Sequence, residues 1–202
     1  MKEKIQSALI VAFIIVVFFS SIGFVFAQNN IQQNSGYYQL NLVIEKQPSG
    51  SNASGEIYSF YVLSNGVLES SNIIKVPFGK EVRISIVNFD PGTSLPFGSS
   101  AENASGVVGG SILATGSVAA GISQQLSSKS AQSISEIPAR DISHTFTTST
   151  GLNIPVLPLS TEVAYTYFNT VGNYTWGCMC DCGAPSMDST GSMTGQFVVL
   201  AP

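Results

Sequence analysis

The stretch that decides the fold is Gly172-Asn173-Tyr174-Thr175-Trp176-Gly177-Cys178, which runs on into Met179-Cys180-Asp181-Cys182-Gly183. The first part predicts a short strand, and the second a loop that carries all three cysteines of the chain. The only histidine, His144, comes earlier, and Met193 follows just before another strand-like run. Soft sulfur atoms and one imidazole, all within about fifty residues, are the parts of a buried copper site. This pattern favours electron transfer over hydrolysis.

Alternation of apolar and polar residues predicts short strands on both sides of this stretch. Asn65-Gly66 predicts a tight turn between two of them, whereas Pro155 and Pro158 interrupt the alternation late in the chain. The expected strands are 37–46, 56–63, 73–76, 82–88, 142–147, 163–168, 174–177 and 196–200. Seven or eight short strands without strong helices predict an all-β fold, a Greek-key sandwich or barrel.

The N-terminus carries a targeting segment. Ala8 to Phe26 is almost wholly apolar and uncharged, and it follows Lys2 and Lys4. A run of roughly 18 or more such residues is long enough to span a bilayer as a helix, whereas Ala27 provides the small residue of a signal-peptide cleavage site. Residues 1–27 are therefore a membrane anchor or a signal peptide, and both place the rest of the chain outside the cytoplasm.

The remaining residues are expected to form a tether, 28–36, and a single domain, 37–202. Within the domain, residues from about 94 to 133 are rich in Gly, Ala and Ser and predict a long insertion. Part of the insertion is expected to pack against the domain, with a short helix near 118–128.

Composition excludes several functions. Charged residues make up 10% of the chain, the net charge is -4, and no Lys or Arg cluster lies beyond the N-terminus, which argues against nucleic-acid binding. The sequence has no Gly-x-Ser-x-Gly elbow and no phosphate-binding glycine loop with a lysine. An electron carrier or a non-catalytic subunit is therefore favoured over a free-standing enzyme.

Several of these segments resemble the cupredoxin family. Lys75 to Val82 and Ile86 to Asp90 resemble its early strands, and His144 lies where that fold places its first copper ligand. Gly172 to Cys178 resembles the strand that enters the ligand loop, and Met193 to Val199 resembles the axial methionine and last strand. The resemblance covers about 37–202 without the insertion, and it implies a cupredoxin-like sandwich that binds copper.

Within that family, Cys178 and Cys182 have the spacing seen in the copper (CuA) domain of haem-copper (cytochrome c) oxidase subunit II. That resemblance implies one or two copper ions, a role in a respiratory chain, and a redox protein or haem-copper oxidase subunits as partners. It implies metal ligands at His144, Cys178, Cys182 and Met193, with the carbonyl of Cys180 as a backbone ligand.

The chain departs from that subtype because Ser186 stands where the family has its second histidine. A full CuA ligand set therefore requires a substitute, for which Asp188, Met187 and Cys180 are the candidates. A mononuclear blue-copper-like site and a modified dinuclear site both remain open. The alternative from another class is a metal-free structural or interaction subunit, in which two of the three cysteines form a disulfide.

A second open choice concerns the apolar segment Pro155 to Leu159, which is either strand packing or a docking patch for a partner.

Overall fold

The computed structural model describes residues 36–47, 57–116 and 131–202. The expected anchor or signal segment, nearly all of the tether and the helix expected near 118–128 lie outside these residues. None of the helices in the described ranges is long and apolar enough to cross a membrane. Residues 37–202 belong to one unit of the chain.

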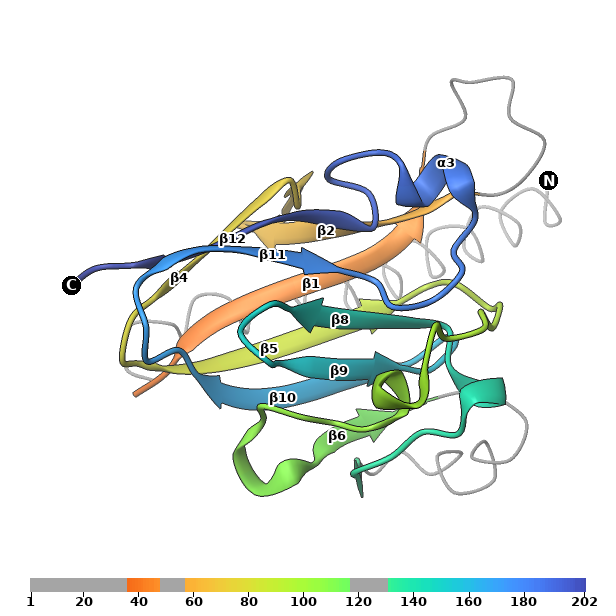
Figure 1. Cartoon of the computed structure of the whole chain (residues 1–202), viewed down its shortest axis with the longest axis horizontal. Coiled ribbons are helices and arrows are strands. Elements are labelled where there is room, and N and C mark those ends of the chain that lie inside the picture. The colour runs from red at the N-terminus through yellow and green to blue at the C-terminus, as the bar shows by residue number, and fades with distance from the viewer. Residues whose placement is uncertain (1–35, 48–56, 117–130) are drawn as a thin grey trace, which may run out of the picture. The chain divides into compact units, whose positions relative to one another are not determined.

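The described residues form two β-sheets (Figure 1). The first sheet has the order β3 (Val67–Ser70), β2 (Tyr58–Ser64), β1 (Tyr38–Lys46), β5 (Glu81–Asn88), β10 (Thr161–Tyr167), β6 (Ile112–Thr115), β7 (Gln132–Ile134). The second has the order β4 (Ile73–Pro77), β12 (Thr194–Leu200), β11 (Gly172–Gly177), β8 (His144–Thr148), β9 (Asn153–Val156). Strands β1 and β5 pair in parallel, as do β12 and β4, because the chain crosses between the sheets. The prediction of an all-β fold is confirmed.

Helical turns are short in the described part of the chain. They are the 3₁₀ turns η2 (Ser99–Glu102), η3 (Val108–Gly110) and η4 (Ala139–Asp141), and the single-turn helix α3 (Ala184–Met187). The cysteine loop lies between β11 and α3, so it is anchored by a strand on one side and a helical turn on the other.

Alternating burial explains why the strands form where the sequence predicts them. In β5, Val82, Ile84 and Ile86 are fully buried and the residues between them are partly exposed. The period of two places every apolar side chain of the strand on one face. Strand β12 alternates in the same way. In β1, Leu40, Leu42 and Ile44 share one buried face, and Val43 is buried as well. Burial of these apolar faces drives the two sheets together.

Aromatic rings join the two sheets across the core. Phe60 on β2 lies 5.9 Å from Phe146 on β8 and 5.4 Å from Trp176 on β11, measured between ring centroids. Phe197 on β12 extends the cluster, at 6.4 Å from Phe146. Edge-on and tilted contacts of this kind add to the free energy gained by burial. The predicted β-sandwich is therefore confirmed, with its core between the two sheets.

Two glycines are required by local geometry. In the hairpin between β2 and β3, Asn65 and Gly66 have φ values of 49° and 79°, which confirms the predicted tight turn. At Gly195, an added Cβ would lie 2.5 Å from Nε1 of Trp176. That nitrogen donates a hydrogen bond of 2.9 Å to the carbonyl of Ser71, so β12 lies against the buried indole only because residue 195 lacks a side chain.

The sequence undercounted the strands. Twelve strands lie in the described ranges, against seven or eight expected. One that was missed is β9, where Pro155 pairs with Thr145. Because β9 is the edge strand of its sheet, a proline without an amide hydrogen is tolerated there. Residues 155–158 are buried and pack into the fold, whereas Leu159 is 41% exposed.

The glycine-rich segment 94–133 contributes to the sheet where it is described. Strand β6 pairs with β10, and its Ile112 and Ala114 are buried in the core. Strand β7 then pairs with β6 at the edge. At its other end, Leu95, Pro96 and Phe97 lie beside the cysteine loop, so the segment also helps to build the candidate site.

Candidate metal centre

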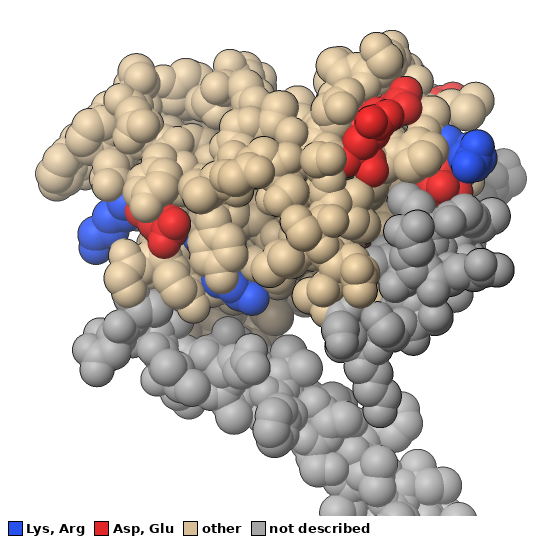
Figure 2. Space-filling view, turned by 90° about the horizontal axis from the view of Figure 1, so that it is seen from below, with Lys and Arg blue, Asp and Glu red and all other residues tan. Residues whose placement is uncertain are grey.

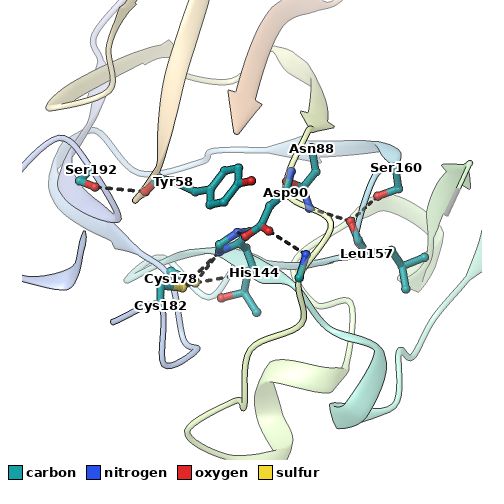
Figure 3. Close-up of polar contacts among 11 residues, drawn as sticks. Tyr58, Asn88, Asp90, His144, Leu157, Ser160, Cys178, Cys182 and Ser192 are labelled. Carbon is teal, nitrogen blue, oxygen red and sulfur yellow. Dashed lines mark hydrogen bonds and ion pairs between the residues drawn. The ribbon is translucent and has the colours of Figure 1, made fainter. Parts of the chain in front are cut away.

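Three segments far apart in the sequence meet at one end of the sandwich (Figure 3). His144 is the first residue of β8, and Cys178 directly follows β11. Strands β8 and β11 are hydrogen-bonded neighbours, with Gly177 paired to Thr147, which places the imidazole and the cysteine loop side by side. Asp90 lies in the turn after β5 and reaches the histidine from the other sheet.

Three potential metal donors converge at this point. Nδ1 of His144 lies 3.2 Å from Sγ of Cys182 and 3.9 Å from Sγ of Cys178. The two sulfur atoms are 3.1 Å apart. His144 and Cys178 are buried, whereas Cys182 is partly exposed, so the cluster is reached from the side of Cys182.

The spacing of these donors fits a single metal ion. Nδ1 of His144 and the two Sγ atoms would hold one ion at bond lengths of about 2.0 to 2.3 Å. Two thiolates and an imidazole form a soft donor set that suits copper and zinc. Zinc in a closed structural site takes four strong protein ligands, whereas the described residues bring only three such donors together.

The electrostatics favour a deprotonated sulfur at the centre. Burial alone raises the pKa of Cys178, but hydrogen bonds from Cys180, Cys182 and His144 lower it well below its usual value. The hydrogen bond with Cys178 and burial together raise the pKa of the Cys180 and Cys182 thiols. One thiolate is therefore stabilised by the other two thiols, and a thiolate is the form that binds metal.

The same arrangement affects the imidazole. Burial lowers the pKa of His144, but its hydrogen bonds with Asp90 and Cys178 outweigh burial and raise that pKa to about 9. The contacts with Asp90 and Cys178 therefore favour a charged ring beside a thiolate at Cys178. A metal cation held by these donors would take the place of a proton.

Cys180 and Met193 lie close by but outside the three-donor cluster. Cys180 is fully buried, its thiol bonds to Cys178, and its carbonyl accepts a hydrogen bond of 2.9 Å from the backbone of Cys182. Met193 is fully buried and lines, with His144 and Cys182, a cavity of about 230 Å³. Its carbonyl accepts a hydrogen bond of 2.8 Å from the amide of Cys178, which ties the two ends of the loop together.

The suggested substitutes for the missing histidine do not join the cluster. Asp188 is exposed and Met187 packs partly against the core. Ser186 is buried, and its amide donates to the carbonyl of Gly183 in α3. In the ranges that the structure covers, the candidate donor group contains only His144, Cys178 and Cys182.

Asp90 is the residue of the site that the sequence did not reveal. Its Oδ2 lies 2.9 Å from Nε2 of His144, at the side of the ring opposite the cysteines. In the sequence, Asp90-Pro91-Gly92 predicts only a turn, and nothing in its spacing links it to a histidine more than fifty positions later. The contact exists because the chain leaves β5 at the place where it enters β8.

No protein-family model matches the sequence, and no curated protein matches it. Among solved structures, a multicopper oxidase is similar at 12% identity and a TM-score of 0.42, over 82% of this chain and 45% of that chain. Reduced rusticyanin is similar at 15% identity and a TM-score of 0.36, over 83% of this chain and 81% of that one.

The periplasmic domain of cytochrome oxidase subunit II from Bradyrhizobium japonicum is similar at 11% identity and a TM-score of 0.37, over 83% of this chain and 86% of that one. Of the multicopper oxidase, by contrast, this chain spans less than half of the length.

Proposed function

We propose that this protein binds one copper ion through His144, Cys178 and Cys182 and carries single electrons. The observation that supports this most strongly is the convergence of the three donor atoms, all within 4.8 Å of one another, at a mostly buried position. Bound copper supplies the one-electron redox couple. Thiolate sulfur suits Cu(I), and imidazole serves both oxidation states, so the donor set suits a metal that cycles between them.

The protein contributes a rigid, partly dry frame for the ion. Cys178 and His144 are held by hydrogen-bonded neighbouring strands, and the amide of Thr145 donates a hydrogen bond of 3.4 Å to Sγ of Cys178. Phe60 packs edge-on to the imidazole with 6.3 Å between ring centroids. A frame that is fixed before binding limits the rearrangement that accompanies a change of charge, which is the condition for fast electron transfer.

A mononuclear site agrees best with the described residues. Met193 is proposed as a weak fourth ligand because it lines the same cavity as His144 and Cys182. A dinuclear centre of the CuA type would need a second strong terminal ligand, and Ser186 has replaced the residue that would supply it. Cys180 is proposed to act through its hydrogen bond to Cys178 rather than as a ligand.

The proposed partner is a redox protein, either a diffusible carrier or subunits of a haem-copper oxidase. Leu95 and Phe97 are exposed beside the cysteine loop, and their segment is fixed to it by hydrogen bonds from Phe97 to Met179 and from Asp181 to Leu95. Figure 2 shows a face on which charged side chains are sparse, in agreement with the 10% of charged residues in the chain. Docking is therefore expected to depend on apolar contact more than on charge.

The proposed location is outside the cytoplasm, at or near a membrane. The apolar run from Ala8 to Phe26 supports this location, whether it is kept as an anchor or removed as a signal peptide.

The competing function is that of a metal-free structural subunit. The specific observation in its favour is the short separation of the sulfur atoms of Cys178 and Cys182, 3.1 Å. An external two-electron oxidant, such as a disulfide or dioxygen, would convert the two thiols to a disulfide with only a small movement. Such a bond would remove both sulfur donors and leave His144 as a buried histidine paired with Asp90. Copper binding and disulfide formation are mutually exclusive at these two sulfur atoms, so the two functions are separable by experiment.

Replacement of His144 by Ala tests the proposal. Copper affinity and the thiolate-to-copper absorption are expected to fall sharply, and added imidazole is expected to restore part of the absorption by entering the vacated space. The fold of the variant is checked by the fluorescence of Trp176, the only tryptophan. A His144→Ala protein that binds copper as tightly as the original would refute the assignment.

A further inference from the structure

We propose that Asp90 is the positioning residue of the metal centre: it fixes the ring of His144 with Nε2 protonated and Nδ1 facing the two sulfur atoms. The inference rests on the proposed copper site for its consequence, but its structural part concerns the metal-free protein as well. Asp90 is outside the group of three donors, and its role is to act through the ring of His144, which its Oδ2 contacts.

The direction of the hydrogen bond follows from the chemistry of the two groups. An ionised carboxylate can only accept, so the 2.9 Å contact with Oδ2 requires a hydrogen on Nε2 of His144. In a neutral ring, Nδ1 then carries the lone pair, and Nδ1 is the atom that faces Cys182 at 3.2 Å. One contact thus selects the tautomer and aims the free lone pair at the metal position.

Asp90 is itself held in place on three sides (Figure 3). Its Oδ1 accepts a hydrogen bond of 2.7 Å from the amide of Gly92, and its own amide donates 3.0 Å to Oδ1 of Asn88. The side-chain nitrogen of Asn88 donates 2.8 Å to the carbonyl of Leu157, and Asn88 is buried. Each carboxylate oxygen therefore has its own partner, and the group has no freedom to turn away from the histidine.

Both oxygens of the Asp90 carboxylate accept a hydrogen bond, one from Gly92 and one from His144, so an amide of the same shape cannot replace the carboxylate. In Asp90→Asn, the side-chain oxygen is needed by the amide of Gly92, which leaves the NH₂ group facing Nε2 of His144. That contact makes Nε2 an acceptor and moves the ring hydrogen to Nδ1, in front of Cys182. The opposite orientation of the amide sets its NH₂ group against the amide of Gly92. Either arrangement loses a hydrogen bond or blocks the metal-binding atom.

Copper affinity distinguishes positioning from a simple effect of charge. The full chain and the variants Asp90→Asn, Asp90→Ala and Asp181→Asn are titrated with Cu(I) against a chromogenic chelator. Asp181 lines the same cavity, and its Oδ1 accepts only a 3.3 Å bond from the amide of Gly183, a bond that asparagine retains. Both Asp90 variants are expected to lose about 10- to 100-fold in affinity, and Asp181→Asn less than about threefold. Equal losses in Asp90→Asn and Asp181→Asn would overturn the proposal.

A second measurement needs no variant and no copper. Because His144 is the only histidine, a ¹⁵N-histidine-labelled chain gives the NMR signals of a single ring. At a pH high enough to leave the ring of His144 neutral, the metal-free protein is expected to carry its single ring hydrogen on Nε2, and Asp90→Ala is expected to carry part of it on Nδ1. A neutral ring with its hydrogen on Nδ1 in the unaltered protein overturns the proposal. If the unaltered protein fails to bind copper, the proposed function is refuted. The NMR result then still decides the role of Asp90.

Discussion

His144 and Phe146 lie two residues apart on β8, both are buried, and both contact the ring of Phe60, yet they belong to regions built in different ways. Phe146 is part of the aromatic core, where contacts are non-directional and many apolar residues of similar volume would serve. His144 is part of the metal end of the sandwich, the group formed by Asp90, His144, Cys178 and Cys182. There each polar atom needs one particular partner at one particular angle. The same strand thus supplies packing at one position and chemistry at the next inward-facing one.

The difference shows in what each region tolerates. Burial of apolar surface in the core raises the free energy of unfolding. A substitution that leaves a cavity there lowers that free energy in proportion to the volume of the cavity. The metal end contributes little by area and depends on a chain of contacts from Asn88 through Asp90 and His144 to the cysteines. Substitutions in the core should therefore change stability, and substitutions at the metal end should change copper binding.

The largest effect is expected from a serine series at the three cysteines. Cys178→Ser and Cys182→Ser each remove a proposed ligand and should abolish the thiolate-to-copper absorption or weaken copper binding by orders of magnitude. Cys180→Ser is the matched control, because it lies in the same loop and is buried but stands outside the donor cluster. It should keep copper bound with a shifted spectrum. Loss of copper in Cys180→Ser equal to that in Cys182→Ser would show that the donor set is wrong.

The next effect is on the core. Phe146→Ala is expected to lower the free energy of unfolding by about 3 to 5 kcal/mol, because it removes a fully buried ring from the aromatic cluster. Urea denaturation of the metal-free protein measures the change, with Phe146→Leu as the control that should lose much less. A cost below about 1 kcal/mol for the alanine variant would mean that the cluster is not the core of the sandwich.

A buried acid in the core predicts a pH effect. Burial raises the pKa of Glu162 from 4.5 to about 8, although hydrogen bonds from Ser160 and the amide of Leu157 partly oppose the rise. The folded state therefore holds this proton more tightly than the unfolded chain. The stabilisation is complete below the ordinary pKa and is lost as the pH rises through about 8, at up to about 1.4 kcal/mol per pH unit.

Glu162→Gln tests that effect because it keeps the shape of the side chain without its ionisation. Stability of the original protein should fall between about pH 5 and 8, and the variant should show a flatter profile over the same window. Parallel profiles for the two proteins would contradict the pKa of Glu162.

The smallest effect is expected at Met193. Replacement by Leu preserves volume in a fully buried position and should change the free energy of unfolding by less than about 1.5 kcal/mol. Copper should remain bound, while loss of a weak thioether ligand should change the reduction potential and the copper hyperfine splitting. Identical potentials, measured by voltammetry, would remove Met193 from the ligand set and leave it as core packing.

Much of the fold follows from local pattern. Strands β1, β5 and β12 were predicted because each has one buried face, and the turn at Asn65-Gly66 because its backbone requires a left-handed conformation. Strands β6 and β9 were missed. A run rich in Gly, Ala and Ser has little apolar contrast, and a proline normally ends a strand unless it lies on an edge, which only the sheet order reveals.

The candidate site was predictable in part for the same reason. His144, Cys178 and Cys182 are rare residue types in this chain, and the structure brings all three together, with Met193 lining the adjoining cavity. Asp90 was not predictable, because an aspartate before Pro-Gly has a sufficient explanation as a turn residue. Its second role depends on the relative position of two strands in different sheets, and that is tertiary information.

Copper loading of the full chain tests the central claim most directly. The protein, with its cysteines reduced, is loaded with copper and studied by metal analysis, optical absorption and EPR, and is then cycled with a reductant and an oxidant. The account predicts one copper per chain, strong thiolate-to-copper absorption that disappears on reduction and returns on oxidation, and a single-copper hyperfine pattern. A chain that binds no copper and instead forms a bond between Cys178 and Cys182 would contradict it, and two coppers sharing one unpaired electron would contradict the mononuclear site.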